Sequence, residues 1–541
     1  MTKNLKSIFF NPAILLVLII LAQSALILYY AGHKKNFYMD EVATLLTAND
    51  SNMPQNGYLE VGRIYSVNDL KSAITIGAGE RFNFEFVKKN LLKDLLHTPL
   101  YFFTFHAAYS VYSFFSDGFS IYPGILLNLA FFILTSVLLY GISRFIFGKY
   151  SALLVNCLWG LSTAAINSVL IIRPYALLAC IFALLTYSVF SSARAKNLNI
   201  SNCLLLWLAV FCGILTHYHF FIFAALVLFI FFVFLAIARR YKDLFKAAAT
   251  AAASFLAAAL CYRPIMQVIF SLAADNSVAD RKISLFNKLF VNAYTSLSLW
   301  LTQTFGGTVW NIIFYAGIIL ILFWAVKVLI KKQPVKINFF IAVCCTSVLF
   351  IVITWQSLSF RNWHDSRYLW PVYPVAAVFF MFLLDSAVNL FFSKNAKKKI
   401  IFAGIAIILT ALPFFEKRPL VWLYTDTPNF SRYRDSLAIG INDSNDGYAL
   451  LRFSGFIYDL TQVKNFVILG KNPGEELDEI LKKGEYRREQ ILLLLHFLAS
   501  APARNSVLSV LEKYGYSVTT DFITEKSEIA VFSSSKETKT Q

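Results

Sequence analysis

Long apolar runs dominate the 541-residue sequence and set the class of fold. About 20 apolar residues in a helix cross the hydrocarbon core of a bilayer, and every backbone polar group there must be paired. We predict about eleven such helices. They cover residues 12–31, 121–143, 151–171, 174–193, 202–216, 218–238, 246–266, 308–330, 337–355, 368–391 and 400–415. The expected fold is therefore a polytopic α-helical membrane protein.

The composition agrees with this class. Hydrophobic residues make up 58% of the chain and charged residues only 15%, fewer than a soluble surface needs. The run at 12–31 is too long for a signal-peptide core and lacks a small-residue cleavage site, so we expect it to be retained. All seven cysteines lie in apolar segments without metal-ligand spacing, which predicts neither a disulfide framework nor a zinc cluster.

The net charge of +18 is explained by its distribution along the chain. If the short aromatic stretch 99–115 does not cross, the basic loops all fall on one side, as the positive-inside rule expects of cytoplasmic loops. We therefore predict that 99–115 is a helix in the outer interface, that the protein lies in the cytoplasmic (inner) membrane, and that no nucleic acid binds. The first loop, 32–98, is then extracytoplasmic.

The sequence changes character after the last predicted span. Segments such as "NFVILG", "QILLLLHFLAS" and "EIAVFSSS", with "YALLRFSGF", are typical of strands, whereas "GEELDEILKKG" and "NSVLSVLEKYG" are typical of helices that end near glycine. Alternating elements of this kind predict a small α/β domain. We expect a transmembrane domain at 1–415 and an extracytoplasmic α/β domain at 416–541.

Polar residues with catalytic potential gather in the predicted outer loops. Each has a local explanation: Asp40 and Glu41 could cap a helix, Arg173 and Arg367 could anchor helix ends, and His217 could be a satisfied interfacial residue. These explanations do not account for acids, histidines and arginines on the same side of the membrane. A shared polar site does, and its candidates are Asp40, Glu41, His97, Tyr101, Arg173, Tyr175, His217, Tyr218, Arg367 and Tyr368.

Several motifs in this order resemble a known family. "FYMDEVATL", "HTPLYFFTFHAAYSVYSFF", "INSVLIIRPYALLACI", "THYHFFIFAALVL" and "SRYLWPVYPVAAV" are similar to the membrane glycosyltransferases of the C superfamily (GT-C). The similarity is greatest to the protein-mannosyltransferase-like branch that contains the lipopolysaccharide galacturonosyl transferases. It spans about residues 12–390. Thr98 replaces a proline of the usual motif, and the approach to Arg173 is apolar where the family often has a polar pair.

This resemblance implies transfer of a sugar from a polyprenyl-phosphate donor to a lipid, glycan or protein acceptor at the outer face. It implies that Asp40 is the general base and that Glu41 supports it or binds the acceptor, because adjacent residues on a helix point about 100° apart. Arg173 and Arg367 offer rigid donors for the leaving phosphate, assisted by His97 or His217. Direct displacement inverts the anomeric centre and requires one carboxylate. We expect no metal and no other cofactor.

Two alternatives from other classes remain. A transporter or flippase for a lipid-linked glycan usually keeps ionisable groups or broken helices near the bilayer midplane, and the predicted spans are almost free of charge. An inactive scaffold would tolerate neutralisation of Asp40, whereas an enzyme would not.

Overall fold

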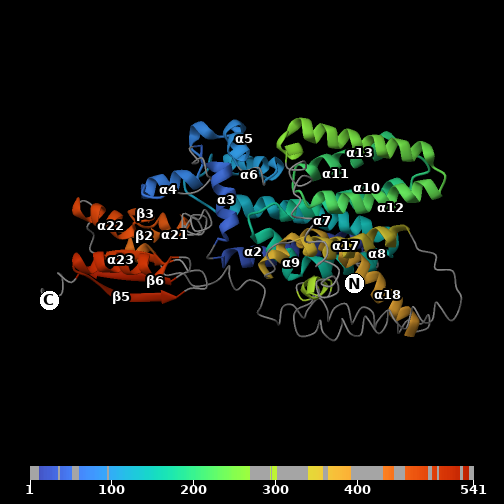
Figure 1. Cartoon of the computed structure of the whole chain (residues 1–541). Helices are drawn as coiled ribbons and strands as arrows, with labels where there is room; N and C mark the ends of the chain where they lie inside the picture. Colours follow the sequence, from blue (N-terminus) through green and yellow to red (C-terminus); the bar gives the residue numbers. More distant parts are fainter. Residues whose placement is uncertain are drawn as a thin grey trace, which may run out of the picture.

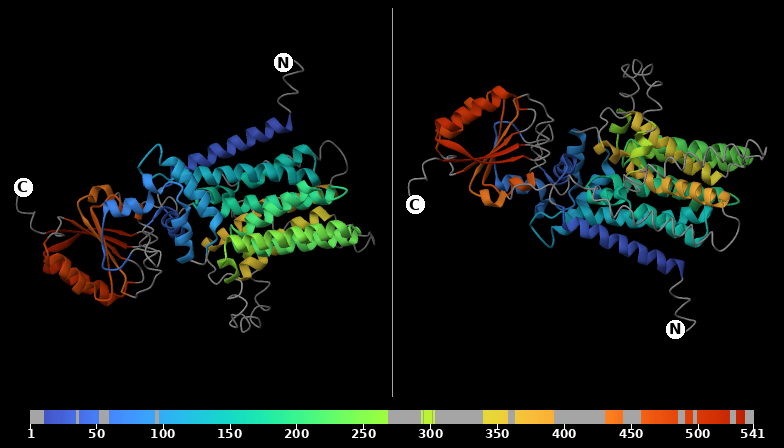
Figure 2. Two further views of the ribbon diagram at one scale, coloured as in Figure 1. Left: turned by 90° about the horizontal axis from the view of Figure 1, so that it is seen from above. Right: turned by 90° about the horizontal axis from the view of Figure 1, so that it is seen from below.

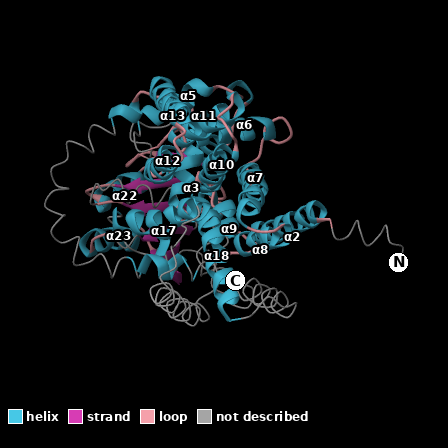
Figure 3. Ribbon diagram, turned by 90° about the vertical axis from the view of Figure 1, so that its right-hand side faces the viewer, coloured by secondary structure: helices cyan, strands magenta, loops and turns pink. Residues whose placement is uncertain are grey.

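The computed structural model places a bundle of long helices at one end of the molecule and a β-sheet at the other, with short helices between them (Figures 1 and 2). Figure 3, viewed along the bundle, shows the helices in front of the strands. The structure describes residues 11–34, 37–51, 60–93, 97–267, 293, 295–300, 302, 339–357, 363–391, 430–443, 457–484, 490–495, 499–523 and 528–534.

Seven helices in these described ranges are long and apolar enough to cross a membrane. They are α2 (Pro12–Gly32), α7 (Tyr122–Ile146), α10 (Tyr175–Arg194), α12 (Phe220–Ile237), α13 (Tyr241–Cys261), α17 (Phe339–Ser357) and the segment Ser366–Asp385, which contains η3 (Trp370–Val372) and the start of α18 (Tyr373–Phe391). The predicted multi-pass helical membrane fold is confirmed. The spans expected at 308–330 and 400–415 lie outside the described residues.

One predicted span is broken. Residues 151–171 were expected to form a single helix, but α8 (Lys149–Gly160) and α9 (Thr163–Leu170) meet at an angle of 59°. Ser162 caps the second helix by accepting a hydrogen bond from the Ala165 N–H at 3.2 Å. Residues 164–170 are all buried. Such a break is tolerated at membrane depth because protein surrounds it.

The helix expected at 202–216 is also shorter than a full span. It is α11 (Ile200–Ile214), 15 residues long. The turn between α11 and α12 carries the predicted site residues His217 and Tyr218.

The first loop and the helix after it form short helices between the bundle and the sheet (Figure 1). These are α3 (Met39–Asn49), α4 (Val67–Ile74), η1 (Ala78–Glu80), α5 (Phe84–Lys93) and, after the loop, α6 (Pro99–Tyr112). The loop also contains the strand β1 (Ile64–Ser66). The expected helix over 99–115 is thus present as α6. One side of α6 buries Tyr101, Phe105 and Tyr109, while Phe114 and Phe115 just beyond its end are exposed. Its place at the outer interface stays a prediction.

The segments predicted as strands around 465–470, 490–500 and 528–535 contribute β3, β4 and β6 to a six-stranded sheet, and the two predicted helices pack on one face of it. Its other C-terminal strands, β2 and β5, were not predicted. The strand order is β1-β3-β2-β4-β6-β5, with β3, β2 and β4 parallel and the outer pairs antiparallel. The remaining elements are β2 (Leu437–Ile441), η5 (Phe430–Tyr433), α21 (Ile457–Leu460), β3 (Asn465–Leu469), α22 (Pro473–Lys482), β4 (Gln490–Leu495), α23 (Ala501–Lys513), β5 (Tyr516–Ile523) and β6 (Glu528–Ser534). The segment "YALLRFSGF" lies outside the described residues.

One strand of this sheet comes from the first loop. Tyr65 of β1 lies opposite Phe466 of β3, in antiparallel register. The central strands are buried on both faces: Ile439 and Val467 pack against α22 and α23, whereas Ala438 and Phe466 belong to the core cluster that continues into the bundle. The loop that carries Asp40 therefore contributes a strand to the sheet, a connection that the sequence did not predict.

Candidate functional site

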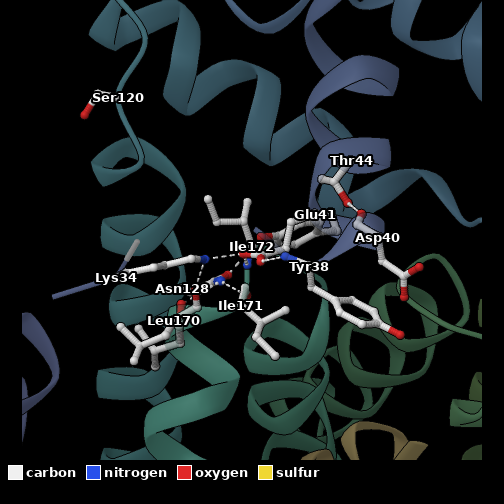
Figure 4. Close-up of polar contacts among 12 residues, drawn as sticks. Lys34, Tyr38, Asp40, Glu41, Thr44, Ser120, Asn128, Leu170, Ile171 and Ile172 are labelled. Atoms are coloured by element: carbon white, nitrogen blue, oxygen red, sulfur yellow. Dashed lines mark hydrogen bonds and ion pairs between the residues drawn. The ribbon is translucent and has the colours of Figure 1, made fainter. Parts of the chain in front are cut away.

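Asp40 lies in the first turn of α3 and pairs with an arginine 327 residues further along the chain. Its Oδ2 is 3.2 Å from Nη2 of Arg367, and the two side chains are 18% and 9% exposed. Figure 4 shows the Asp40 carboxylate pointing away from the neighbouring Glu41. Asp40 is thus a partly accessible acid held beside a nearly buried cation.

The Arg367 guanidinium is held by tyrosines as well as by Asp40. Its Nε donates to the Tyr175 hydroxyl at 3.0 Å, and its Nη2 donates to the Tyr368 hydroxyl at 3.2 Å. The guanidinium carbon also lies 4.9 Å from the ring centre of Tyr38 and 4.7 Å from that of Tyr368. Hydroxyl acceptors and aromatic faces of this kind stabilise a guanidinium away from water.

Arg173 approaches Asp40 from the other direction, through the backbone. Its Nη1 donates to the Asp40 carbonyl at 3.2 Å and to the Thr44 hydroxyl at 3.0 Å, and its Nη2 is 2.9 Å from Nε2 of His97. The side chain is buried, and its Nε has no hydrogen-bond partner within the described ranges. Burial opposes the charge, but Asp40 favours it, so that the pKa of Arg173 is raised and the group stays protonated.

Histidines of the α11–α12 turn border the same cluster. The rings of His217 and His219 stack with centres 4.8 Å apart, and their Nδ1 atoms are 3.1 Å apart. The ring centre of His217 is 6.0 Å from that of Tyr368 and 6.5 Å from that of Tyr175. Tyr218 lies in the same turn, where its carbonyl accepts the Phe221 N–H at 3.1 Å.

Both histidines are neutral at pH 7. Burial lowers the pKa of His217 well below its ordinary value, and the positive charge of Arg173 lowers it further. Burial lowers the pKa of His219 to about 4. This turn therefore offers neutral hydrogen-bonding groups beside two permanent cations.

This neutrality predicts a stability that depends on pH. Unfolding restores a histidine pKa of about 6.5, so between about pH 6.5 and pH 4 the unfolded state binds a proton that the folded state does not bind. The contribution of the neutral His219 to the free energy of unfolding is therefore fully present above about pH 6.5 and is lost as the pH falls toward 4. Between pH 7 and pH 5, the Tm of the wild type should fall more than that of His219→Gln, by on the order of 2–4 °C. Equal slopes in the two proteins would contradict a neutral buried His219.

Two predicted site residues, Tyr101 and Glu41, are buried beside the cluster and form hydrogen bonds with residues around it. Tyr101 is fully buried and donates to Oδ1 of Asn128 at 3.1 Å. Burial raises the pKa of its hydroxyl well above the ordinary value, so it stays protonated. Glu41 is also fully buried and forms an ion pair with Lys34. Its oxygens accept the Ile172 N–H at 2.8 Å and the Tyr38 N–H at 2.7 Å.

Sequence inspection missed four residues that hold the site: Lys34, Tyr38, Thr44 and Asn128. Two signals were present. Thr44 follows Asp40 by four residues and so lies on the same helical face. Asn128 is the one amide side chain in the predicted span 121–143, and polar residues in spans usually have a specific partner. Lys34 and Tyr38 carry no comparable local signal.

In the described part of the chain, no group of three or more histidine, cysteine, aspartate or glutamate side chains is arranged to hold a metal ion. The residues that do converge are basic, aromatic and hydroxylic around one partly accessible carboxylate.

Solved structures of other proteins are similar to this chain. No protein-family model and no curated protein sequence matches the chain. ArnT from Cupriavidus metallidurans is similar in its apo state, with 11% identity and a TM-score of 0.48 over 95% of this chain and 97% of that chain. The undecaprenyl phosphate-bound form of ArnT has 9% identity and a TM-score of 0.47 over the same shares.

A second similar structure is the archaeal oligosaccharyltransferase AglB from Archaeoglobus fulgidus, in complex with an inhibitory peptide and a dolichol-phosphate. Its identity is 9% and its TM-score 0.44, over 96% of this chain and 74% of that chain.

Proposed function

We propose that this protein is an integral-membrane glycosyltransferase that moves a sugar from a polyprenyl-phosphate donor to a hydroxyl of a lipid, glycan or protein acceptor. Asp40 is the general base. The observation that carries the proposal is the position of its carboxylate, 18% exposed and paired with Arg367, on a helix turn that Arg173 also contacts. These three residues come from distant segments, so the fold itself assembles an acid beside two cations.

The two guanidiniums are suited to the phosphate of the donor. Arg173 and Arg367 lie close enough for each to oppose the charge of the other, which an anion between or beside them would relieve. Arg367 offers a planar fork of donors, and such forks bind phosphate oxygens in pairs. An anionic leaving group at this position is stabilised as the bond to the sugar breaks.

Donor binding also frees the base. In the structure one carboxylate oxygen of Asp40 accepts a hydrogen bond from Arg367. When the donor phosphate takes Arg367 as its partner, that oxygen can accept the proton of the acceptor hydroxyl. The acceptor oxygen then bonds to the anomeric carbon, the bond from that carbon to the phosphate oxygen breaks, and the phosphate leaves with the electron pair. A single in-line displacement of this kind inverts the anomeric centre.

The sequence motifs support the same function. The Asp-Glu pair after the first span, the "HTPLYFF" helix start and the "IIRPYALL" helix start resemble those of GT-C glycosyltransferases, and the structure brings His97, Arg173 and Asp40 of these motifs into contact. The charge bias of the loops favours an extracytoplasmic site in the cytoplasmic membrane. The α/β domain at 416–541 is extracytoplasmic in the same topology.

One observation favours the alternative, a transporter or flippase for a lipid-linked glycan. The 59° bend between α8 and α9 is a broken helix, as transporters often have beside a substrate site. A flippase moves the lipid across the bilayer and leaves the sugar-phosphate bond intact, whereas a transferase breaks it.

Purified protein in nanodiscs, supplied with a panel of radiolabelled polyprenyl-phosphate sugars and candidate acceptors, tests the proposal. The expected result is free polyprenyl phosphate together with a new glycoside whose anomeric configuration is opposite to that of the donor. In a parallel assay with the protein in sealed vesicles, movement of intact donor from one leaflet to the other without release of polyprenyl phosphate would instead establish the alternative. A product with retained configuration would exclude the single displacement.

A further inference from the structure

The junction between α9 and α10 is an irregular piece of buried backbone directly before Arg173. Helix α9 ends at Leu170 and α10 begins at Tyr175. Ile171 and Ile172 are both buried, so polar backbone groups here require partners from the protein. How these groups are paired determines how firmly Arg173 is held.

Three side chains from other segments pair them. Lys34 donates to the Leu170 carbonyl at 2.6 Å. Asn128 of α7 donates to the carbonyls of Val169 at 3.1 Å and Ile171 at 2.9 Å. Glu41 of α3 accepts the Ile172 N–H at 2.8 Å. Figure 4 shows these side chains converging on residues 170–172.

Glu41 already accepts three hydrogen bonds and is buried away from any substrate. One of its oxygens accepts from Ile172 and Lys34, and the other accepts the Tyr38 N–H at 2.7 Å. Glu41 and Lys34 have side chains that are 0% and 1% exposed, in contrast with the 18% of Asp40. A carboxylate without accessible surface cannot meet an acceptor hydroxyl.

Helix α3, which carries Glu41, has a second link to the α9–α10 junction through the side chain of Arg173. Arg173 donates to the Asp40 carbonyl and to the Thr44 hydroxyl, while Glu41 lies between these residues on α3. The link from Glu41 to Ile172 therefore fixes the backbone from which Arg173 reaches Asp40.

We propose that Glu41 is a positioning residue, which together with Lys34 and Asn128 clamps the α9–α10 junction and thereby holds Arg173 against Asp40 for binding of the donor phosphate. The proposal rests on the proposed function for its kinetic consequence. Of the two expectations for Glu41, that it supports Asp40 or that it binds the acceptor, the proposal keeps the first and makes the support act through Arg173.

The test uses the chemistry of a buried ion pair. Removing one partner leaves an uncompensated buried charge, whereas replacing both by neutral groups is often tolerated. Glu41→Gln and Lys34→Gln alone should each raise the KM for the polyprenyl-phosphate sugar and lower kcat/KM by about 10–100-fold. In the double variant both charges are gone while an acceptor for Ile172 and a donor for Leu170 remain. It should recover to within about tenfold of the wild type.

Hydrogen exchange in the peptide that covers residues 170–175 provides a readout that does not require activity. Protection should fall in each single variant and return in the double variant. A double variant as inactive or as misfolded as Glu41→Gln would overturn the proposal, and so would single variants with unchanged protection and kinetics. If no donor is turned over by the wild type, the proposed function fails, while the exchange pattern still decides whether the clamp exists.

The chain contains a matched control. Asp243 pairs with Arg240 at 2.8 Å and accepts the Leu198 N–H at 3.0 Å, so it clamps another loop in a similar way. Asp243→Asn should change exchange near Leu198 and leave the donor KM unchanged. An equal rise of the donor KM in this variant would show that loss of any such pair is sufficient, and would overturn a specific role for Glu41.

Discussion

Asp40→Asn is expected to reduce sugar transfer by about 10²–10⁴-fold in kcat, because a positioned general base contributes an effect of this size. The amide has the shape of the carboxylate but cannot accept the acceptor proton. Because Asp40 is 18% exposed and its backbone carbonyl still receives Arg173, the variant should insert and fold. The measurement is kcat and the donor KM in nanodiscs, with the Tm as a check of the fold.

Glu85 supplies the control for this substitution. It is an exposed acid in the first turn of α5, in the same loop. Glu85→Gln should retain wild-type kcat. Asp40→Asn with activity within tenfold of wild type would exclude Asp40 as the base and would favour the scaffold or transporter alternatives.

Much of the fold followed from the sequence because membrane spans are determined by length and hydrophobicity alone. The predicted runs at 174–193 and 218–238 agree with α10 and α12 within a few residues. The break at Gly160 to Ser162 was not predicted, since the apolar run continues through it and only the buried environment makes the bend possible.

The sheet shows a different limit of sequence analysis. β3 and β4 were predicted from their apolar runs, but β1 was not, because three residues carry too little pattern and its partner lies about 400 residues away in the chain. Pairing over such separations is set by the tertiary structure.

The sequence predicted which residues belong to the candidate site, but not how they are arranged in space. The excess of ionisable residues in the predicted outer loops indicated that Asp40, His97, Arg173 and Arg367 belong together. In the structure Asp40 contacts Arg367 and Arg173, and Arg173 contacts His97. The different environments of Asp40 and Glu41 could not be predicted in the same way. Helical geometry separates Asp40 from Glu41 by direction, but only the position of Lys34 and the α9–α10 junction shows that Glu41 is the buried one.

The second large effect is expected at Arg367. Arg367→Gln removes the cation nearest to the base and the donors to Tyr175 and Tyr368. Loss of one preorganised donor to a developing anion typically costs about 10²–10³-fold in kcat. Arg367 also binds the ground-state phosphate in our scheme, so the donor KM should rise as well. Arg367→Lys keeps the charge but loses the fork, and should fall between the wild type and Arg367→Gln.

Binding of the product separates this role from a purely structural one. Free polyprenyl phosphate should raise the Tm of the wild type and of Asp40→Asn, but not that of Arg367→Gln, because ligand that binds only the folded state stabilises it. Arg81 is a suitable control, since its guanidinium also lies over an aromatic ring, that of Phe114 at 4.3 Å, and donates to the Ser113 hydroxyl at 2.8 Å. Arg81→Gln should keep the Tm response. An undiminished response in Arg367→Gln would place the phosphate elsewhere, and Arg367 would then serve only to hold Asp40.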